Sequence, residues 1–190
     1  MDEEICNGGR VKTFSWREAF EDAEEGARAG LPKYQNFAGY CYYVGRGVTK
    51  DLEKARHWFE VAAKNGQVTA MFNLGLMYDR GEISPRNASQ AVRLYREAAN
   101  RGDLQAQANL AAMLLDGDGA ERNTVEGVKW LRRAARRGDG KAQYNLGRAY
   151  LGGNGVRKNA RHANTWLSKA SKSGHAKARR LLLRLAAKAS

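Results

Sequence analysis

The sequence has few of the residues on which catalysis, metal binding and disulfide scaffolds depend. Its 190 residues include two cysteines, three histidines and two prolines. Cys6 and Cys41 are too few for a disulfide framework, so a reducing compartment fits the composition. The histidines (His57, His162 and His175) are scattered, and no HExxH, GxSxG or CxxC spacing occurs. We therefore predict a protein that is not an enzyme, with no catalytic residue, no metal site and no cofactor.

Long apolar runs are also absent. A helix that spans a bilayer needs about 18 consecutive apolar residues or more, and the chain has no such run. The N-terminal segment MDEEICNGGRVK lacks the basic stretch and the apolar core of a signal peptide. The sequence thus predicts a cytoplasmic protein without a transmembrane segment, in which residues 1–14 form a flexible lead-in.

What the chain has instead is a period of 36 residues. When the stretch from Ala70 to Gln105 is moved by 36 positions, like residues fall on like without a gap. Three such sets are Leu74 with Leu110 and Leu146, Gly81 with Gly45, Gly117 and Gly153, and Ala98 with Ala62, Ala134 and Ala170. A fixed period of this length is typical of stacked repeats, because each unit is too small to bury its own apolar face.

Each unit predicts a pair of helices. The first helix carries apolar residues at i, i+4 and i+8, as in Ala70, Leu74 and Tyr78, which lie on one helix face. A glycine-rich turn follows, except in the second unit, where Pro85 indicates a different turn. The second helix starts after a capping residue at a constant phase (Asp51, Asn87, Asn123 and Asn159) and ends at a glycine. At another constant phase, Trp58, Leu94, Trp130 and Trp166 are expected to supply most of its buried area.

The predicted fold is therefore an all-α solenoid of antiparallel helix pairs. Four full repeats begin near residues 34, 70, 106 and 142. An N-terminal half-repeat over residues 15–29 and a C-terminal capping helix over residues 177–190 complete a single domain of residues 15–190.

These phased positions resemble the Sel1-like repeat, a TPR-like (tetratricopeptide-like) helical hairpin. The first unit carries the pattern at Gly39, Tyr42, Gly45, Gly47, Val48, Asp51, Lys54, Ala55, Trp58, Ala62, Ala63 and Gly66. The resemblance implies a right-handed superhelix and an adaptor or scaffold that binds another protein along its concave face. Within such families, a bacterial regulatory or immunity-type role is the specific version that we expect. Secreted members with a cysteine pair in every repeat differ from this chain.

One candidate binding surface follows from helix geometry. At about 100° per residue, positions 72, 76 and 79 lie opposite the Leu74 face of a first helix. First helices line the concave wall in TPR-like stacks, and aromatic side chains are frequent at binding hot spots. The predicted partner-binding residues are Tyr40, Tyr43, Phe72, Leu76, Tyr144 and Arg148. The alternative is that these side chains only pack between neighbouring first helices.

A second candidate surface is cationic. The net charge is +13, and residues 121–190 carry 18 basic and 3 acidic side chains. Two clusters form the predicted basic patch: Arg132, Arg133, Arg136 and Arg137 at the end of one helix, and Lys177, Arg180, Arg184 and Lys188 as a stripe on the last helix. This patch predicts a protein partner with an acidic surface, and nucleic acid or an anionic membrane surface is the alternative partner. A patch that only keeps the array solvated is the third interpretation.

Overall fold

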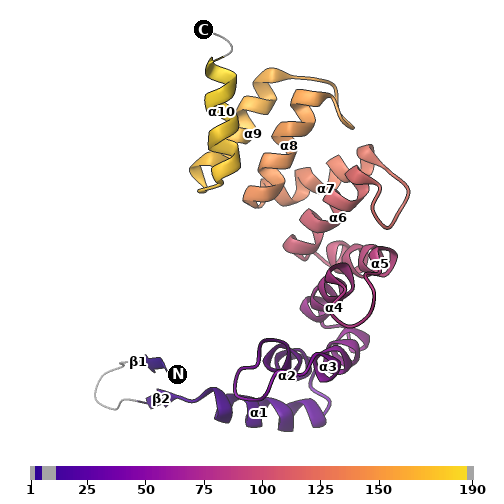
Figure 1. Cartoon of the computed structure of the whole chain (residues 1–190), viewed down its shortest axis with the longest axis vertical. Helices are drawn as coiled ribbons and strands as arrows, with labels where there is room; N and C mark the ends of the chain where they lie inside the picture. The colour runs from indigo at the N-terminus through magenta and orange to yellow at the C-terminus, as the bar shows by residue number, and fades with distance from the viewer. Residues whose placement is uncertain (1–2, 6–11, 188–190) are drawn as a thin grey trace. The chain divides into compact units, whose positions relative to one another are not determined.

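The computed structural model describes residues 3–5 and 12–187, which form a two-stranded ribbon followed by ten α-helices (Figure 1). Strands β1 (Glu3–Ile5) and β2 (Lys12–Phe14) pair antiparallel, with Glu3 opposite Phe14. The sequence did not predict these strands, which lie in the stretch interpreted as a lead-in. The all-α class predicted for the repeats is confirmed.

The helices repeat with the predicted period. The first helices are α2 (Pro32–Val44), α4 (Val68–Arg80), α6 (Leu104–Asp116), α8 (Gly140–Gly152) and α10 (Ala176–Ala187). The second helices are α1 (Trp16–Arg28), α3 (Leu52–Lys64), α5 (Ala88–Asn100), α7 (Thr124–Arg136) and α9 (Ala160–Lys172). Equivalent helices start 36 residues apart. The half-repeat is α1, and the capping helix is α10.

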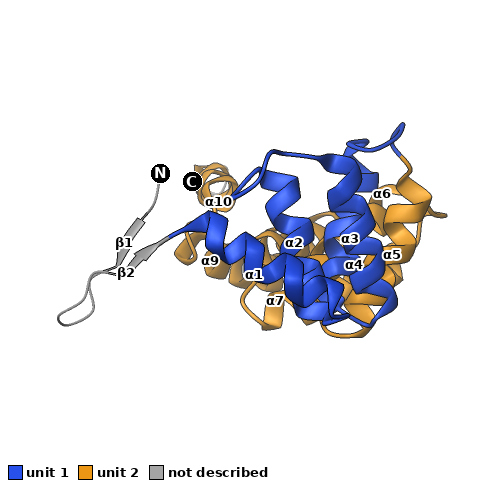
Figure 2. Cartoon of the chain, turned by 90° about the horizontal axis from the view of Figure 1, so that it is seen from below, with its two compact units in different colours: residues 1–86 blue, residues 87–190 orange. Residues whose placement is uncertain are grey.

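The chain divides into two compact units, residues 1–86 and 87–190 (Figure 2). The first contains α1 to α4 and the second contains α5 to α10. Within each unit, every helix packs against the next one along the chain. Each unit is compact by itself, and the single domain over residues 15–190 stays a prediction.

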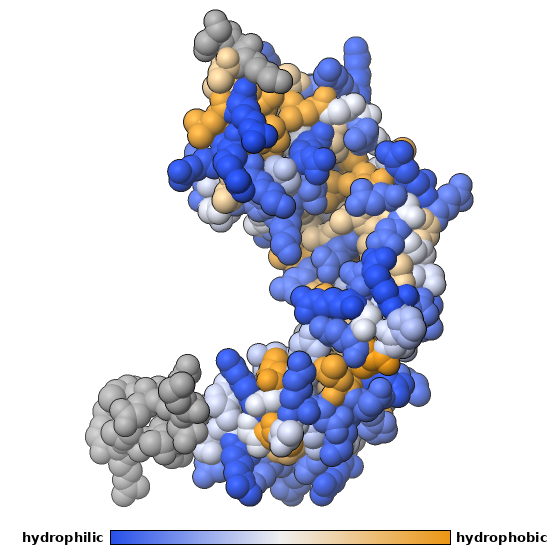
Figure 3. Space-filling view, viewed as in Figure 1, coloured by the Kyte–Doolittle hydropathy of each residue, from blue (hydrophilic) through white to orange (hydrophobic). Residues whose placement is uncertain are grey.

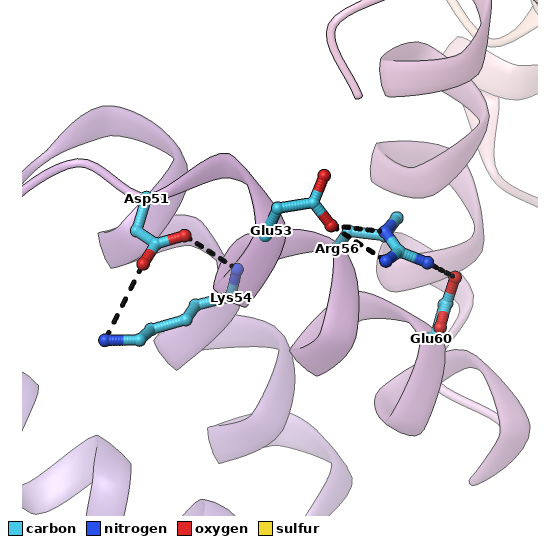
Figure 4. Close-up of polar contacts among 5 residues, drawn as sticks. All are labelled: Asp51, Glu53, Lys54, Arg56 and Glu60. Atoms are coloured by element: carbon cyan, nitrogen blue, oxygen red, sulfur yellow. Dashed lines mark hydrogen bonds and ion pairs between the residues drawn. The ribbon is translucent and has the colours of Figure 1, made fainter. Parts of the chain in front are cut away.

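Asparagine and aspartate side chains cap the helices where the sequence predicted it. Asp51 Oδ1 accepts a hydrogen bond from the Lys54 backbone amide at 3.0 Å, as Figure 4 shows, and Asn123 does the same for Glu126 at 2.9 Å. Two further caps were not predicted. Asp103 and Asp139 accept bonds from amides in the first turns of α6 and α8, at 2.7 and 2.6 Å. These aspartates lie in the short turns that join consecutive repeats.

The deepest core positions lie one residue after the predicted tryptophan phase. Leu94 and Trp130 are buried, but Trp58 and Trp166 are only half-buried. The fully buried set at the next position consists of Phe59, Tyr95, Leu131 and Leu167, each at most 1% exposed. Small neighbours make this packing possible, because a Cβ at Gly39 would lie 2.8 Å from the Phe59 ring. The position after the tryptophan phase is therefore the more deeply buried of the two in every repeat.

Candidate partner-binding groove

The second unit has a groove of about 290 Å³ between the C-terminal halves of the first helices α6 and α8. Ala112, Leu115 and Ala149 form its apolar walls. The polar lining consists of Asp116, Arg122, Asn145, Arg148 and Asn154, together with the exposed backbone of Gly152. Apolar and charged side chains therefore line the groove together, and most of the lining is polar.

Two arginines give the groove its positive charge. The Arg122 side chain is held in place, because its Nε donates a hydrogen bond to the Leu115 carbonyl oxygen at 2.9 Å. The Arg148 guanidinium lies 5.8 Å from the centroid of the Tyr144 ring. Neither arginine forms an ion pair with a carboxylate of the described residues, and the opposing charge in the lining comes from Asp116. Both guanidinium groups thus keep donors free for a ligand.

The equivalent positions in the first unit are filled and bridged. Tyr43 occupies the position of Leu115, and its hydroxyl donates to Glu82 Oε1 at 3.0 Å. Arg80 Nη1 donates to the same hydroxyl oxygen at 2.9 Å. Burial raises the pKa of the Tyr43 hydroxyl, and the hydrogen bond to Glu82 adds to this shift. Glu82 and Arg80 stand where the second unit has Asn154 and Gly152, so the smaller residues of the second unit leave its groove open.

The predicted concave-face residues have different environments, and Arg148 is the one that lines the groove. Phe72 is buried, at 9% exposure, so it offers a partner little surface. Tyr40, Tyr43, Leu76 and Tyr144 are half-buried. The Tyr40 ring stacks on Phe37, with centroids 6.5 Å apart, and the Tyr144 ring stacks on His175 at 4.7 Å.

Most of the groove was not predicted from the sequence, because the prediction relied on large side chains. Ala112 and Gly152 create the space by being small where other repeats have Tyr40, Leu76 or Arg80. Arg122 lies in the turn after α6, outside the helix face that the period highlighted. Residue size at equivalent phases is the signal that could have revealed the open space.

The arginines at the end of α7 mostly contact neighbouring groups. Arg132 Nη2 donates to the Tyr150 hydroxyl at 3.1 Å, and the Arg133 guanidinium lies 4.6 Å from the centroid of the Trp130 ring. Arg137 Nη1 donates to the Gly102 carbonyl oxygen. Arg136 is exposed. These residues thus form part of the packing between repeats as well as a charged surface.

The predicted stripe on α10 is exposed over its described part. Lys177, Arg180 and Arg184 are exposed, whereas Lys188 lies outside the described residues. In the first unit, by contrast, Arg56 lies between Glu53 and Glu60 with N–O distances of 2.8 and 3.1 Å (Figure 4). After residue 126, the described part of the chain contains no ion pair. The described cations after residue 126 therefore have no carboxylate partner in the described part of the chain, whereas Arg96 and Arg101 earlier in the second unit are paired with Glu126 and Glu97.

Figure 3 shows that hydrophilic side chains cover most of the face in view, with apolar side chains in separate patches. None of the described helices is long and apolar enough to cross a membrane.

The described residues also contain no group of three or more histidine, cysteine, aspartate or glutamate side chains that could hold a metal ion. Cys41 is buried, and burial raises the pKa of its thiol to about 11, so the side chain is a packing group rather than a reactive nucleophile.

A comparison with known families matches the helix pairs directly. The pattern described as the Sel1 repeat matches residues 32–67, 68–103, 104–139 and 140–175. Each matched stretch contains one first helix and one second helix. The chain belongs to the Sel1 repeat family. The repeats begin two residues before the positions near 34, 70, 106 and 142 that the sequence predicted.

Two solved structures of Sel1 repeat proteins are similar over most of this chain. One is c5321, a protective antigen present in uropathogenic Escherichia coli strains, with 39% identity and a TM-score of 0.83. The similarity covers 86% of this chain and 35% of the c5321 chain. The other is a Sel1 repeat protein from Oxalobacter formigenes, with 34% identity and a TM-score of 0.81. This similarity covers 88% of our chain and 69% of the Oxalobacter formigenes chain.

A curated relative matches a shorter stretch. The chitin synthase regulator SKT5 of Saccharomyces cerevisiae is 44% identical over 57 residues, which make up 30% of this chain and 8% of the yeast protein. Sel1 repeat proteins generally mediate protein–protein interactions and are typically non-catalytic scaffolds. Because the match covers so little of the yeast protein, its role does not transfer to this chain by similarity.

Proposed function

We propose that this Sel1 repeat chain is a non-enzymatic scaffold that binds a protein partner in the groove between α6 and α8. The observation that carries the proposal is the difference between equivalent surfaces of the two units. Tyr43, Arg80 and Glu82 bridge this position in the first unit, whereas Leu115, Gly152 and Asn154 leave it open in the second. The open surface combines charged side chains with apolar ones, and a partner segment can be held between them.

The charge of the second unit favours an acidic partner. Cations without a carboxylate partner attract an acidic surface during encounter and raise the association rate. A regulatory or immunity-type role, in which the chain covers a cognate effector, would use the same groove. The family-level role in protein–protein interaction supports the scaffold, and the choice of groove and partner is our proposal.

A photo-cross-linking residue at position 115 tests the proposal in cells. We expect a partner to be cross-linked from the groove position and not from Thr165, an exposed residue of α9 outside the groove. The Ala112→Trp variant should abolish binding of that partner, because the indole fills the space between α6 and α8. Thr165→Trp is the matched control and should bind normally.

Circular dichroism and thermal melting must first show that both tryptophan variants are folded. Cross-linking of the partner from position 165 with equal yield would contradict the proposed location. Full binding by a folded Ala112→Trp variant would contradict it as well.

The alternative function is binding of nucleic acid or an anionic membrane surface by the basic patch. Its support is the exposure of Lys177, Arg180 and Arg184 and the lack of ion pairs after residue 126 in the described part of the chain. The groove does not contribute to this alternative, because the α10 residues do not line it.

A further inference from the structure

We infer that the groove between α6 and α8 is a carboxylate-binding site, and that it takes an aspartate or glutamate side chain from an extended acidic segment of the partner. This inference rests on the proposed function and adds the chemistry of the bound segment. Three features of the groove carry it: the guanidinium of Arg122, which a bond to the Leu115 carbonyl holds in place, the second cation Arg148, and the amide of Asn145, which bonds to no other described side chain.

An equivalent arginine in the second repeat shows which group fits beside Arg122. Arg86 is in the same turn position, 36 residues earlier, and its Nε donates to the Asp79 carbonyl oxygen at 2.8 Å. Its Nη2 also donates to the Asp79 carboxylate oxygen Oδ1 at 2.7 Å. Arg122 keeps the carbonyl bond, but Leu115 replaces the aspartate. Leu115 offers no carboxylate, so a carboxylate from a partner can pair with the Arg122 guanidinium as Asp79 pairs with that of Arg86.

The Asn145 side chain also lacks a partner among the described residues, because the residue that would bond to it differs from its equivalent in the first unit. In the first unit, Asn73 at the equivalent position donates from Nδ2 to Asn36 Oδ1 at 3.2 Å. The residue equivalent to Asn36 in the third repeat is Ala108, which has no amide, and the Asn145 side chain makes no hydrogen bond to another described residue. An amide offers one donor group and one acceptor, which suits the backbone of an extended segment.

The groove also determines which residues can flank the bound carboxylate in the partner segment. Asp116 lines the groove and repels a second carboxylate near it. A run of consecutive acidic residues therefore fits less well than acidic residues that are spaced apart. The walls of Ala112, Leu115 and Ala149 suit an apolar side chain. We therefore expect acidic residues that are separated from one another by apolar ones.

The probe for the test is a short fluorescent peptide of alternating leucine and aspartate, blocked at both ends, and its counterpart with asparagine in place of aspartate. We expect the aspartate peptide to bind at least about tenfold more tightly, since hydrogen bonds between two charged groups are the strong ones. Arg122→Gln and Arg148→Gln should each weaken its binding by about tenfold. The Arg122→Gln amide can still donate to the Leu115 carbonyl, so this variant is expected to fold.

Two further variants control for charge. Arg157→Gln removes the same charge from an exposed residue of the neighbouring turn outside the groove, and should change the affinity by less than about twofold. Asp116→Asn should tighten binding of the aspartate peptide. Equal binding of the two peptides, an equal effect of Arg157→Gln, or no binding of the aspartate peptide at about 1 mM would each overturn the inference.

Cross-linking from position 115 separates this inference from the proposed function. If the partner is still captured there by Arg122→Gln and Arg148→Gln with full yield, the groove binds a protein but not through a carboxylate. If the peptides behave as expected but the partner cross-links from Thr165 instead, the carboxylate site stands and the proposed docking surface fails.

Discussion

Gln35, Gln107 and Gln143 show how a single side chain joins consecutive repeats. Each is buried, and each Nε2 donates to the backbone carbonyl eight residues earlier, at 3.3, 3.2 and 3.1 Å. The second repeat has Met71 at this position, fully buried and without such a bond. Gln35 differs from the other two because its Oε1 also accepts a bond from Asn65 Nδ2, at 2.9 Å. The Oε1 atoms of Gln107 and Gln143 have no such partner among the described residues.

These contacts predict unequal effects of the same substitution. Gln35→Met loses two hydrogen bonds and should lower the free energy of unfolding by about 1 to 2 kcal/mol. Gln143→Met loses one bond but also removes a buried oxygen without a partner among the described residues, so we expect a change within about 0.5 kcal/mol. Urea denaturation of the two variants measures the difference. A Gln143→Met variant that is less stable than Gln35→Met would contradict this account.

At the residue scale, the sequence predicted the caps better than the groove. Asp51 and Asn123 have side chains that can satisfy a helix N-terminus locally, so their role is readable from spacing alone. Leu115 lies at the phase of position 79, which the sequence placed on the concave face, but its part in a groove depends on what lies opposite and on a bond from the Arg122 side chain to its carbonyl. Such a role is set by contacts between side chains and turns that the repeat pattern does not encode.

At the scale of elements, one glycine in each regular turn docks the turn on the preceding repeat. Gly155 has a φ of +69°, and a Cβ on it would lie 2.1 Å from the Thr124 carbonyl oxygen at the start of α7. A Cβ on Gly47 would likewise clash with the backbone of Trp16, and a Cβ on Gly119 with the backbone of Ala88. The second repeat has Ile83 at this position, so its turn cannot make the same close approach.

This geometry separates two kinds of glycine. Gly155→Ala combines a left-handed backbone with a clash against backbone atoms, and should destabilise the protein by about 3 kcal/mol or more. Gly174 has a φ of +84°, but a Cβ on it would meet no atom within 4 Å, so Gly174→Ala should cost only about 1 to 2 kcal/mol of backbone strain. Thermal and urea denaturation of both variants tests the ranking. Equal destabilisation would show that the docking contact adds nothing.

The sequence predicted the elements with little error, because the period, the caps and the helix-ending glycines agree with one another. Gly66, for example, has a φ of +84°, and the Gln67 amide donates to the Ala62 carbonyl at 2.9 Å, as expected after a helix. Trp58 and Trp166 are less deeply buried than Phe59 and Leu167, because apolar residues occupy two adjacent phases of the second helix. Periodicity identifies the buried face, but it does not rank two neighbouring positions on that face.

At the scale of the whole molecule, the separation of charge along the chain is the main feature. Residues 1–60 contain 9 basic and 11 acidic side chains, whereas residues 121–190 contain 18 and 3. In the first unit, Arg17, Arg28 and Arg56 pair with glutamates one helical turn away. The second unit therefore has an excess of positive charge that internal ion pairs do not neutralise. This excess attracts polyanions in general.

This excess predicts weak, salt-sensitive binding of single-stranded RNA that does not depend on the groove. We expect affinity for a polyuridine probe to fall with rising salt, because each phosphate contact releases a counterion. Replacing Lys177, Arg180 and Arg184 together by glutamine should reduce the slope of log affinity against log salt by about two. The same replacement of Arg17, Arg28 and Arg56 is the matched control, and should change the slope by less, since carboxylates already neutralise these cations. Fluorescence polarisation at several salt concentrations measures both slopes. A dependence on Arg122 as strong as that on the α10 cations would place the RNA in the groove and contradict the separation of the two surfaces.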